Sequence, residues 1–276
     1  MASFKARILV LCKTYPSPSG KHVETSCVAG LTDKADLIRL FPVPFRLISD
    51  EKQFRKWQWI TARIEKAPAD RRLESHKIFV DTVQCDPEPL STGKNWAERR
   101  AALNGLKVYD DFETLEQDRV MAGTTLGLIR PSKILGLDIT PVDDPEWTDN
   151  EKQKLEQNER QIGLFEAVDA KSLATLRKLP FLFHYRYECN SEGESKFFRH
   201  KIADWEAGAL YWKCRQRYGN SWEQPFRDKL MGDLSKKDLM FLMGTIHRFP
   251  NQWLIVSLIY PPKLAPDAEF QQSMQF

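Results

Sequence analysis

Apolar residues in this chain come in short runs, and their length limits what the chain can fold into. The longest run near the end, from Trp253 to Tyr260, has the length of a buried strand. No stretch reaches the roughly 18 apolar residues that a membrane-spanning helix requires. The chain leads straight into the short strand-like run from Ile8 to Cys12, whereas a signal peptide needs a longer apolar region and a small-residue cleavage site, and neither is present. The sequence therefore predicts a cytoplasmic protein that does not enter the membrane.

The composition indicates a folded protein of one or two domains. The chain has 276 residues, of which 42% are hydrophobic, enough for one large core or two modest ones. Aromatic residues make up 11%, whereas disordered chains are poor in aromatic residues.

The order of the expected elements predicts an α+β fold. The first part is rich in strand patterns, such as the alternation of Ile60, Ala62 and Ile64 with polar residues. The middle is helical and acidic, and Thr148 to Glu151 matches a capping box at a helix start. We predict a β-rich, barrel-like (OB-like) domain with a helical insert over 1–142, an acidic helical connector over 143–170, and a C-terminal α/β domain over 171–276.

Charge is distributed unevenly along the chain, although the net charge is only +3. Residues 1–76 carry 14 Lys or Arg against 8 Asp or Glu, and residues 177–248 carry 14 against 9. Residues 107–160 reverse the balance, with 7 against 13. Two basic segments flanking an acidic one suit an anionic ligand, but an ordinary solvated surface gives the same pattern.

Common catalytic and cofactor motifs are absent from the sequence. None of the 13 glycines forms a GxGxxG or GxxxxGK[ST] motif, and neither GxSxG nor HExxH occurs. The five cysteines are widely spaced and form no CxxC pair, which indicates free buried thiols. We therefore expect no cofactor and no metal.

One segment, from His200 to Glu206, could carry chemistry. His200 and Asp204 would lie one turn apart on a helix, where they could act as a base and an acid beside Glu206. The alternative is structural, because an Asp at this position can cap a helix that begins at Trp205. On that reading, Trp205 packs beneath the strand 181–189.

Cations and aromatic residues interleave in two places, which is typical of surfaces that stack bases and follow phosphates. Alternatively, each aromatic residue belongs to the core and each cation is an ordinary solvated side chain. The candidate nucleic-acid-binding residues are Arg39, Phe41, Phe45, Arg46, Arg55, Lys56, Trp59, Arg71 and Arg72 in the first basic segment, and Lys213 and Arg217 on an expected helix.

Four strings together resemble a poorly characterised prokaryotic family of dual OB-fold proteins linked to defence or mobile elements. They are Cys27-Val-Ala-Gly-Leu31 with Ile38 to Arg46, Pro180 to Cys189, His200 to Glu206, and Trp253 to Lys263. The strings span most of the chain and contain no catalytic motif. The resemblance implies two barrel-like halves and a role in nucleic-acid binding.

The leading hypothesis is therefore a nucleic-acid-binding accessory or sensor protein, with single strands as the favoured ligand and a function in antiviral defence. A second hypothesis is a metal-dependent hydrolase, a nuclease that uses His200, Asp204 and Glu206. A third is a non-catalytic subunit whose acidic middle docks a basic partner protein.

The cysteine and histidine spacing generates a first prediction. Purified protein should hold less than one zinc ion per chain and keep its fold in a chelator, because no paired ligand spacing exists. Elemental analysis and a melting curve in chelator measure this. One tightly held zinc per chain would contradict it, and Cys189, His200 and Cys214 would then be the first ligands to test.

Overall fold

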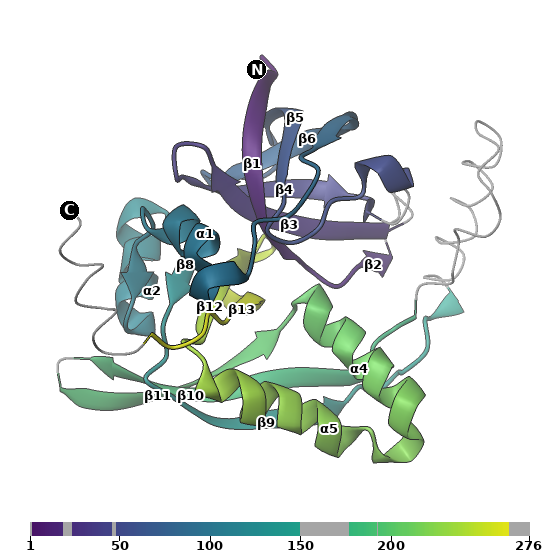
Figure 1. Cartoon of the computed structure of the whole chain (residues 1–276), viewed down its shortest axis with the longest axis vertical. Helices are drawn as coiled ribbons and strands as arrows, with labels where there is room; N and C mark the ends of the chain where they lie inside the picture. Colours follow the sequence, from purple (N-terminus) through teal and green to yellow (C-terminus); the bar gives the residue numbers. More distant parts are fainter. Residues whose placement is uncertain (1, 19–23, 46–47, 150–176, 192, 265–276) are drawn as a thin grey trace.

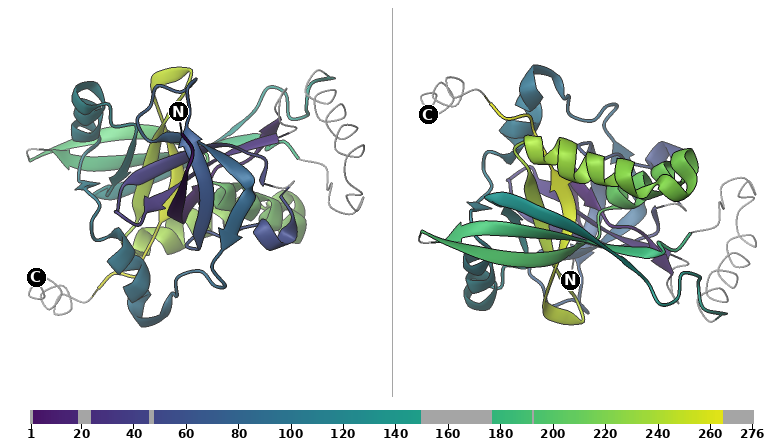
Figure 2. Two further views of the ribbon diagram at one scale, coloured as in Figure 1. Left: turned by 90° about the horizontal axis from the view of Figure 1, so that it is seen from above. Right: turned by 90° about the horizontal axis from the view of Figure 1, so that it is seen from below.

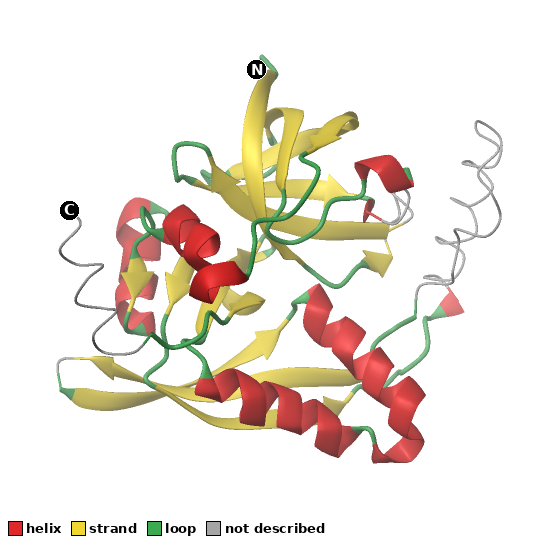
Figure 3. Cartoon of the chain, viewed as in Figure 1, coloured by secondary structure: helices red, strands yellow, loops and turns green. Residues whose placement is uncertain are grey.

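The structure is a computed structural model that describes residues 2–18, 24–45, 48–149, 177–191 and 193–264. A small barrel stands on a larger twisted sheet, and helices cover the opposite face of that sheet (Figures 1 and 3). The chain is thus an α+β protein, as its sequence predicts.

The N-terminal domain is a closed five-stranded barrel. The strands neighbour one another in the order β1-β5-β6-β4-β3, and β3 returns to pair with β1. Only β4 and β6 are parallel, and the other pairs are antiparallel. This is the arrangement of an OB-fold barrel. The barrel strands are β1 (Phe4–Lys13), β3 (Glu24–Thr32), β4 (Leu37–Val43), β5 (Trp59–Lys66) and β6 (Ser75–Cys85). The short β2 (Ser17–Pro18) pairs antiparallel with the start of β3, and the 3₁₀ turn η2 (Asp50–Lys52) precedes β5.

Alternate side chains of the barrel strands point inward and form an apolar core. Ile60, Ala62 and Ile64 on β5 point inward and are buried, as the sequence pattern predicts. Phe45 and Phe54 pack edge to face at 5.0 Å at one end of the core.

Two helices follow the barrel, α1 (Gly93–Leu103) and α2 (Phe112–Ala122). The Asp111 carboxylate caps α2 by accepting a bond from the Thr114 amide at 2.8 Å. Gly123 ends α2 with a φ of 74°, a left-handed conformation that glycine adopts without strain.

The second domain is built on a mixed seven-stranded sheet in the order β7-β8-β12-β13-β11-β10-β9. The strands are β7 (Val108–Tyr109), β8 (Leu126–Ile129), β9 (Lys133–Pro141), β10 (Phe181–Ser191), β11 (Glu194–Ile202), β12 (Met240–Ile246) and β13 (Phe249–Ile259). Two sequence-based predictions are wrong in this region. The division into domains lies before β7 rather than at residue 143, because β7, β8 and β9 join this sheet. The second half is an open sheet and not a second barrel.

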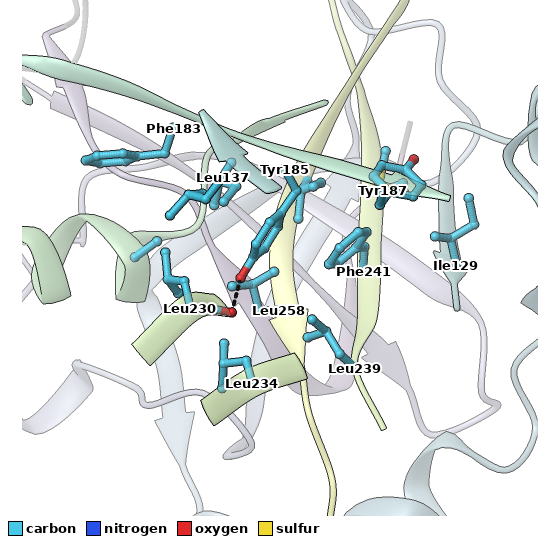
Figure 4. Packing of buried hydrophobic residues seen from close by; sticks show 14 of the residues in the cluster. Ile129, Leu137, Phe183, Tyr185, Tyr187, Leu230, Leu234, Leu239, Phe241 and Leu258 are labelled. Atoms are coloured by element: carbon cyan, nitrogen blue, oxygen red, sulfur yellow. Dashed lines mark hydrogen bonds between the residues drawn. The ribbon is translucent and has the colours of Figure 1, made fainter. Parts of the chain in front are cut away.

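Helices cover one face of this sheet over an aromatic core. They are α4 (Trp205–Tyr218), η3 (Gly219–Ser221), α5 (Glu223–Arg227), η4 (Asp228–Asp233) and η5 (Leu234–Lys236). Tyr185 stacks on Phe241 at 5.3 Å, and its hydroxyl donates to the Leu230 carbonyl at 2.9 Å (Figure 4). This bond satisfies the one polar atom that Tyr185 brings into the core.

The opposite face of the sheet is docked on the barrel. Leu9 and Leu11 of β1 point out of the barrel and pack with Leu242 and Val256 of β12 and β13. Consequently β1 is buried on both faces from Ile8 to Cys12. A near-continuous apolar run is what a strand with two covered faces requires.

The predicted acidic connector lies almost entirely outside the described residues, which end at residue 149 and resume at 177. Within the described part of the chain, no helix is long and apolar enough to cross a membrane.

The shared apolar interface generates a second prediction. Leu11→Ala should lower the free energy of unfolding by about 2–5 kcal/mol, the usual cost of such a buried cavity. Because Leu11 contacts both domains, the whole molecule should still unfold in one transition at lower urea concentration. Tryptophan fluorescence and far-UV circular dichroism measure it. Two separate transitions, with only one of them shifted, would contradict the shared core.

Candidate nucleic-acid interface

The face of an OB barrel that usually meets oligonucleotides is partly closed in this protein. That face is formed by the second and third barrel strands, here β3 and β4. Arg39 lies at its middle on β4 and is only 3% exposed. Its guanidinium donates to the backbone carbonyls of Thr125 at 2.9 Å and Thr245 at 3.4 Å, and to the Glu74 carboxylate at 3.2 Å. The second domain therefore covers the centre of the face.

One aromatic residue on this face stays open. Phe41 follows Arg39 on the outward side of β4 and is 45% exposed. Strand β4 runs parallel to β1, since both are antiparallel to β3. Strand β1 ends beside the start of α4, where the Tyr15 amide donates to the Ala203 carbonyl. Since β4 runs in the same direction as β1, Phe41 lies closer to β11 than Arg39 does, because Arg39 contacts the ends of β8 and β12.

The sheet surface in that direction carries two arginines that one carboxylate holds together. Arg186 on β10 and Arg199 on β11 are direct cross-strand partners. Their Nε atoms donate to the two oxygens of Asp138 at 2.9 Å and 2.8 Å. Hydrogen bonding from Arg199 and Arg186 lowers the pKa of Asp138, which keeps the carboxylate charged. We call these residues the arginine pair.

A glycine makes room for this arrangement. A Cβ atom at Gly136 would lie 2.5 Å from the Arg186 Nη2 atom, so the guanidinium rests directly on the backbone of β9. The Nη groups of both arginines bond to nothing among the described residues. Four NH₂ groups are thus oriented and free to donate.

The surroundings of the arginine pair include a further cation and an exposed ring. Lys201 lies two residues after Arg199, and burial lowers its pKa. Burial lowers the pKa of His184 as well, with a further contribution from the charges of Arg199 and Lys201. Phe197, two residues before Arg199 on the same face, is 67% exposed. The β10–β11 hairpin extends beyond the barrel and is uncovered from above (Figure 2, left).

Three of the residues predicted to bind nucleic acid do not reach the surface. Arg39 bridges the two domains, and Phe45 is in the barrel core. The Lys56 ammonium is enclosed at the junction, where it donates to Glu206 at 2.9 Å and to the Leu258 carbonyl at 2.8 Å. Phe45 is buried by the barrel's own core, whereas Arg39 and Lys56 are covered by the second domain, which the local sequence does not reveal.

The other predicted residues are scattered rather than gathered. Arg55 pairs with Glu88, Arg72 pairs with Asp70 and the Thr245 carbonyl, and Trp59 lies half-buried below Arg7. Arg46 lies outside the described residues. Those that are exposed without a paired carboxylate are Phe41, Arg71, Lys213 and Arg217.

Sequence reasoning did not find the arginine pair. Arg186 alternates with His184 and Glu188 on one side of an expected strand, which was the available signal. The strand that carries Arg199 was not expected, so its pairing with Arg186 was invisible.

The residues proposed for a nuclease are kept apart. His200 points into the helix-covered core, where its Nδ1 is 3.0 Å from the Tyr187 hydroxyl, and burial lowers its pKa to about 4. Asp204 faces the barrel instead and is buried, while Glu206 is exposed. The described residues include no group of three or more His, Cys, Asp or Glu that could hold a metal. This geometry gives the nuclease hypothesis no support.

Asp204 has the predicted structural role. Its Oδ1 accepts the Glu206 amide at 2.8 Å and caps α4. Its Oδ2 accepts the Leu258 amide of β13, also at 2.8 Å. The expected packing of Trp205 beneath β10 is not found. Its ring packs instead against Phe45 of the barrel, with ring centroids 5.4 Å apart.

The chain belongs to a family described as a domain of unknown function (DUF8757), whose model matches residues 109–275. A second family, also described as a domain of unknown function (DUF8758), matches residues 4–105. The two matches meet close to the division between barrel and sheet. No match is found among the curated proteins.

Among solved structures, the chain is similar to one described as a replication protein A heterotrimer bound to ssDNA. The identity is 8% and the TM-score 0.36, over 99% of this chain and 51% of the other. The chain therefore spans about half the length of that one. The strand order itself, and not this likeness, defines the barrel.

The two bonds of Asp204 generate a third prediction. Asp204→Ala and Asp204→Asn should both destabilise the protein, by about 1–3 kcal/mol for a buried amide left without a partner. Asn caps helices about as well as Asp in general, but here its NH₂ group would face the Leu258 amide or the Glu206 amide. Denaturant unfolding of both variants measures it. An Asn variant as stable as the parent would contradict the double role.

Proposed function

We propose that the protein binds single-stranded nucleic acid where the open part of the β3–β4 face meets the arginine pair. The observation that carries this proposal is the pair itself, two guanidinium groups fixed by one carboxylate, whose four Nη groups bond to nothing in the part of the chain that the structure describes. Fixed guanidinium groups bind phosphate with little loss of conformational freedom.

Exposed aromatic rings favour single strands over duplexes. Phe41 on the barrel and Phe197 on the sheet can stack only on bases that are not already stacked within a helix. Phosphate contacts from Arg186 and Arg199 and stacking on these rings together make a surface with little sequence preference.

We further propose a role as an accessory or sensor protein in prokaryotic antiviral defence. Its sole support is the resemblance carried by the four sequence strings. A partner protein that docks on the acidic middle is the alternative to nucleic acid. Purification from the native host, with analysis of both bound protein and bound nucleic acid, separates the two.

The arginine pair generates a fourth prediction. Arg186→Ala with Arg199→Ala should weaken binding of a fluorescent single-stranded oligonucleotide by at least about tenfold at low salt, through the loss of two charge-assisted contacts. The salt dependence should also fall, because each phosphate contact contributes roughly 0.7 to the slope of log K against log salt. Fluorescence anisotropy at several salt concentrations measures both.

Matched controls make this test specific. Lys236→Ala with Lys237→Ala removes the same charge from exposed positions at the end of η5 and should leave binding unchanged. Phe41→Ala should weaken binding without changing the salt slope. Lys213→Ala with Arg217→Ala tests the basic stripe of α4 predicted from sequence. Equal losses in the Lys236/Lys237 variant and the Arg186/Arg199 variant would reduce the proposal to non-specific attraction and overturn it.

A further inference from the structure

We infer that the arginine pair, together with Lys201, receives the terminal phosphate of a strand, a phosphomonoester, rather than the phosphodiesters along its length. This inference rests on the proposed function and names the part of the nucleic acid that the site takes. A terminal phosphate carries about two negative charges at neutral pH and offers three free oxygens, whereas a phosphodiester carries about one charge and offers fewer oxygens.

Strand pairing places Lys201 on the same face of the sheet as the arginine pair. Lys201 is the direct cross-strand partner of His184 on β10. The next pair on this face is Arg199 with Arg186, and His184 is also opposite Asp138 on β9. Directly opposite side chains of an antiparallel ladder point to the same face. The ammonium, the two guanidinium groups and their shared carboxylate are therefore neighbours on one surface.

The charges on this surface match a phosphomonoester better than a phosphodiester. The arginine pair and Lys201 carry three positive charges against the one negative charge of Asp138, which leaves a net charge of +2. Further along the same face, Glu188 lies opposite Lys133 of β9, and these two charges cancel. A terminal phosphate balances the surplus, whereas a phosphodiester would leave one positive charge unmatched.

The Lys201 ammonium has no partner in the part of the chain that the structure describes. It is half-buried, and burial lowers its pKa. Among the described residues, no carboxylate lies within ion-pair distance of its Nζ atom, and no acceptor is bonded to it. The Nδ1 atom of the neighbouring His184 is likewise buried without a partner among those residues. Such groups are normally hydrogen-bonded in native structures, and a bound anion would supply acceptors to the ammonium.

Lys201 lies at the border where the barrel begins to cover the sheet. Its parallel partner on β13 is Leu254, which packs against the core shared by the two domains. Toward the tip of the β10–β11 hairpin, Arg199 and Phe197 are exposed. A terminal phosphate suits such a border because its chain continues in one direction only, whereas an internal phosphate needs room for the chain on both sides.

The test uses the full chain and single-stranded oligonucleotides that carry an internal fluorophore and differ only at their ends: a 5′-phosphate, a 3′-phosphate or neither. Fluorescence anisotropy at low salt should show one phosphorylated form binding at least about tenfold more tightly than the unphosphorylated form, through added charge-assisted contacts. The form that binds more tightly identifies the end that the site takes. An unphosphorylated oligonucleotide one nucleotide longer controls for the added charge and should bind like the shorter one.

Lys201→Gln separates recognition of the end from general affinity. This variant should lose most of the preference for the phosphorylated end, while its binding of the unphosphorylated oligonucleotide stays nearly unchanged. Lys236→Gln, which removes one exposed charge from η5, is the matched control and should keep the preference. Far-UV circular dichroism checks that both variants are folded.

Failure of this inference can be told apart from failure of the proposed function. If the parent binds all forms equally while the Arg186/Arg199 variant weakens them, the proposed function stands and this inference is overturned, whether or not Lys201→Gln folds. If the Arg186/Arg199 variant binds every form like the parent, both are overturned. A preference that survives in Lys201→Gln also overturns the inference. Tighter binding of a phosphoserine peptide than of the phosphorylated oligonucleotide would assign the site to a phosphorylated protein and overturn it as well.

Discussion

The burial of one charge, that of Arg39, determines how the rest of this protein is arranged. A guanidinium removed from water is costly unless its donors are matched. Glu74 supplies the opposite charge from the barrel, and the carbonyls of Thr125 and Thr245 supply acceptors from the second domain. The Thr125 hydroxyl bonds to Glu74 as well, so the two domains complete a single network. Separating them would leave an arginine and a carboxylate with half of their partners.

This network changes what the barrel can offer to a ligand. An OB barrel standing alone presents the whole of its second and third strands, whereas here the centre of that face is an internal contact. The cations closest to it in sequence, Arg39 and Arg72, bond to the neighbouring domain. The two guanidinium groups proposed to meet a ligand, those of Arg186 and Arg199, come instead from strands distant in the sequence. A ligand can therefore reach this face of the barrel only at its borders.

The sequence predicted the local structure better than the surfaces. The alternation around Ile60 and the cap at Asp204 are local patterns, and both are found as expected. The number of barrels, the place of β7 to β9 and the burial of Lys56 depend on which sheet a strand joins and what covers it. Those are contacts between distant segments, and one sequence carries no record of them. The arginine pair is likewise created by strand pairing and has no signature in either strand alone.

The burial of β1 on both of its faces has a consequence for the two halves of the chain. Along this strand, Ile8 and Val10 serve the barrel core while Leu9 and Leu11 serve the interface. A gene fragment ending after the first family match, at residue 105, would encode a barrel with an uncovered apolar wall and a tendency to aggregate. A substitution at Leu9 or Leu11 in the first half therefore disturbs the packing of the second half as well.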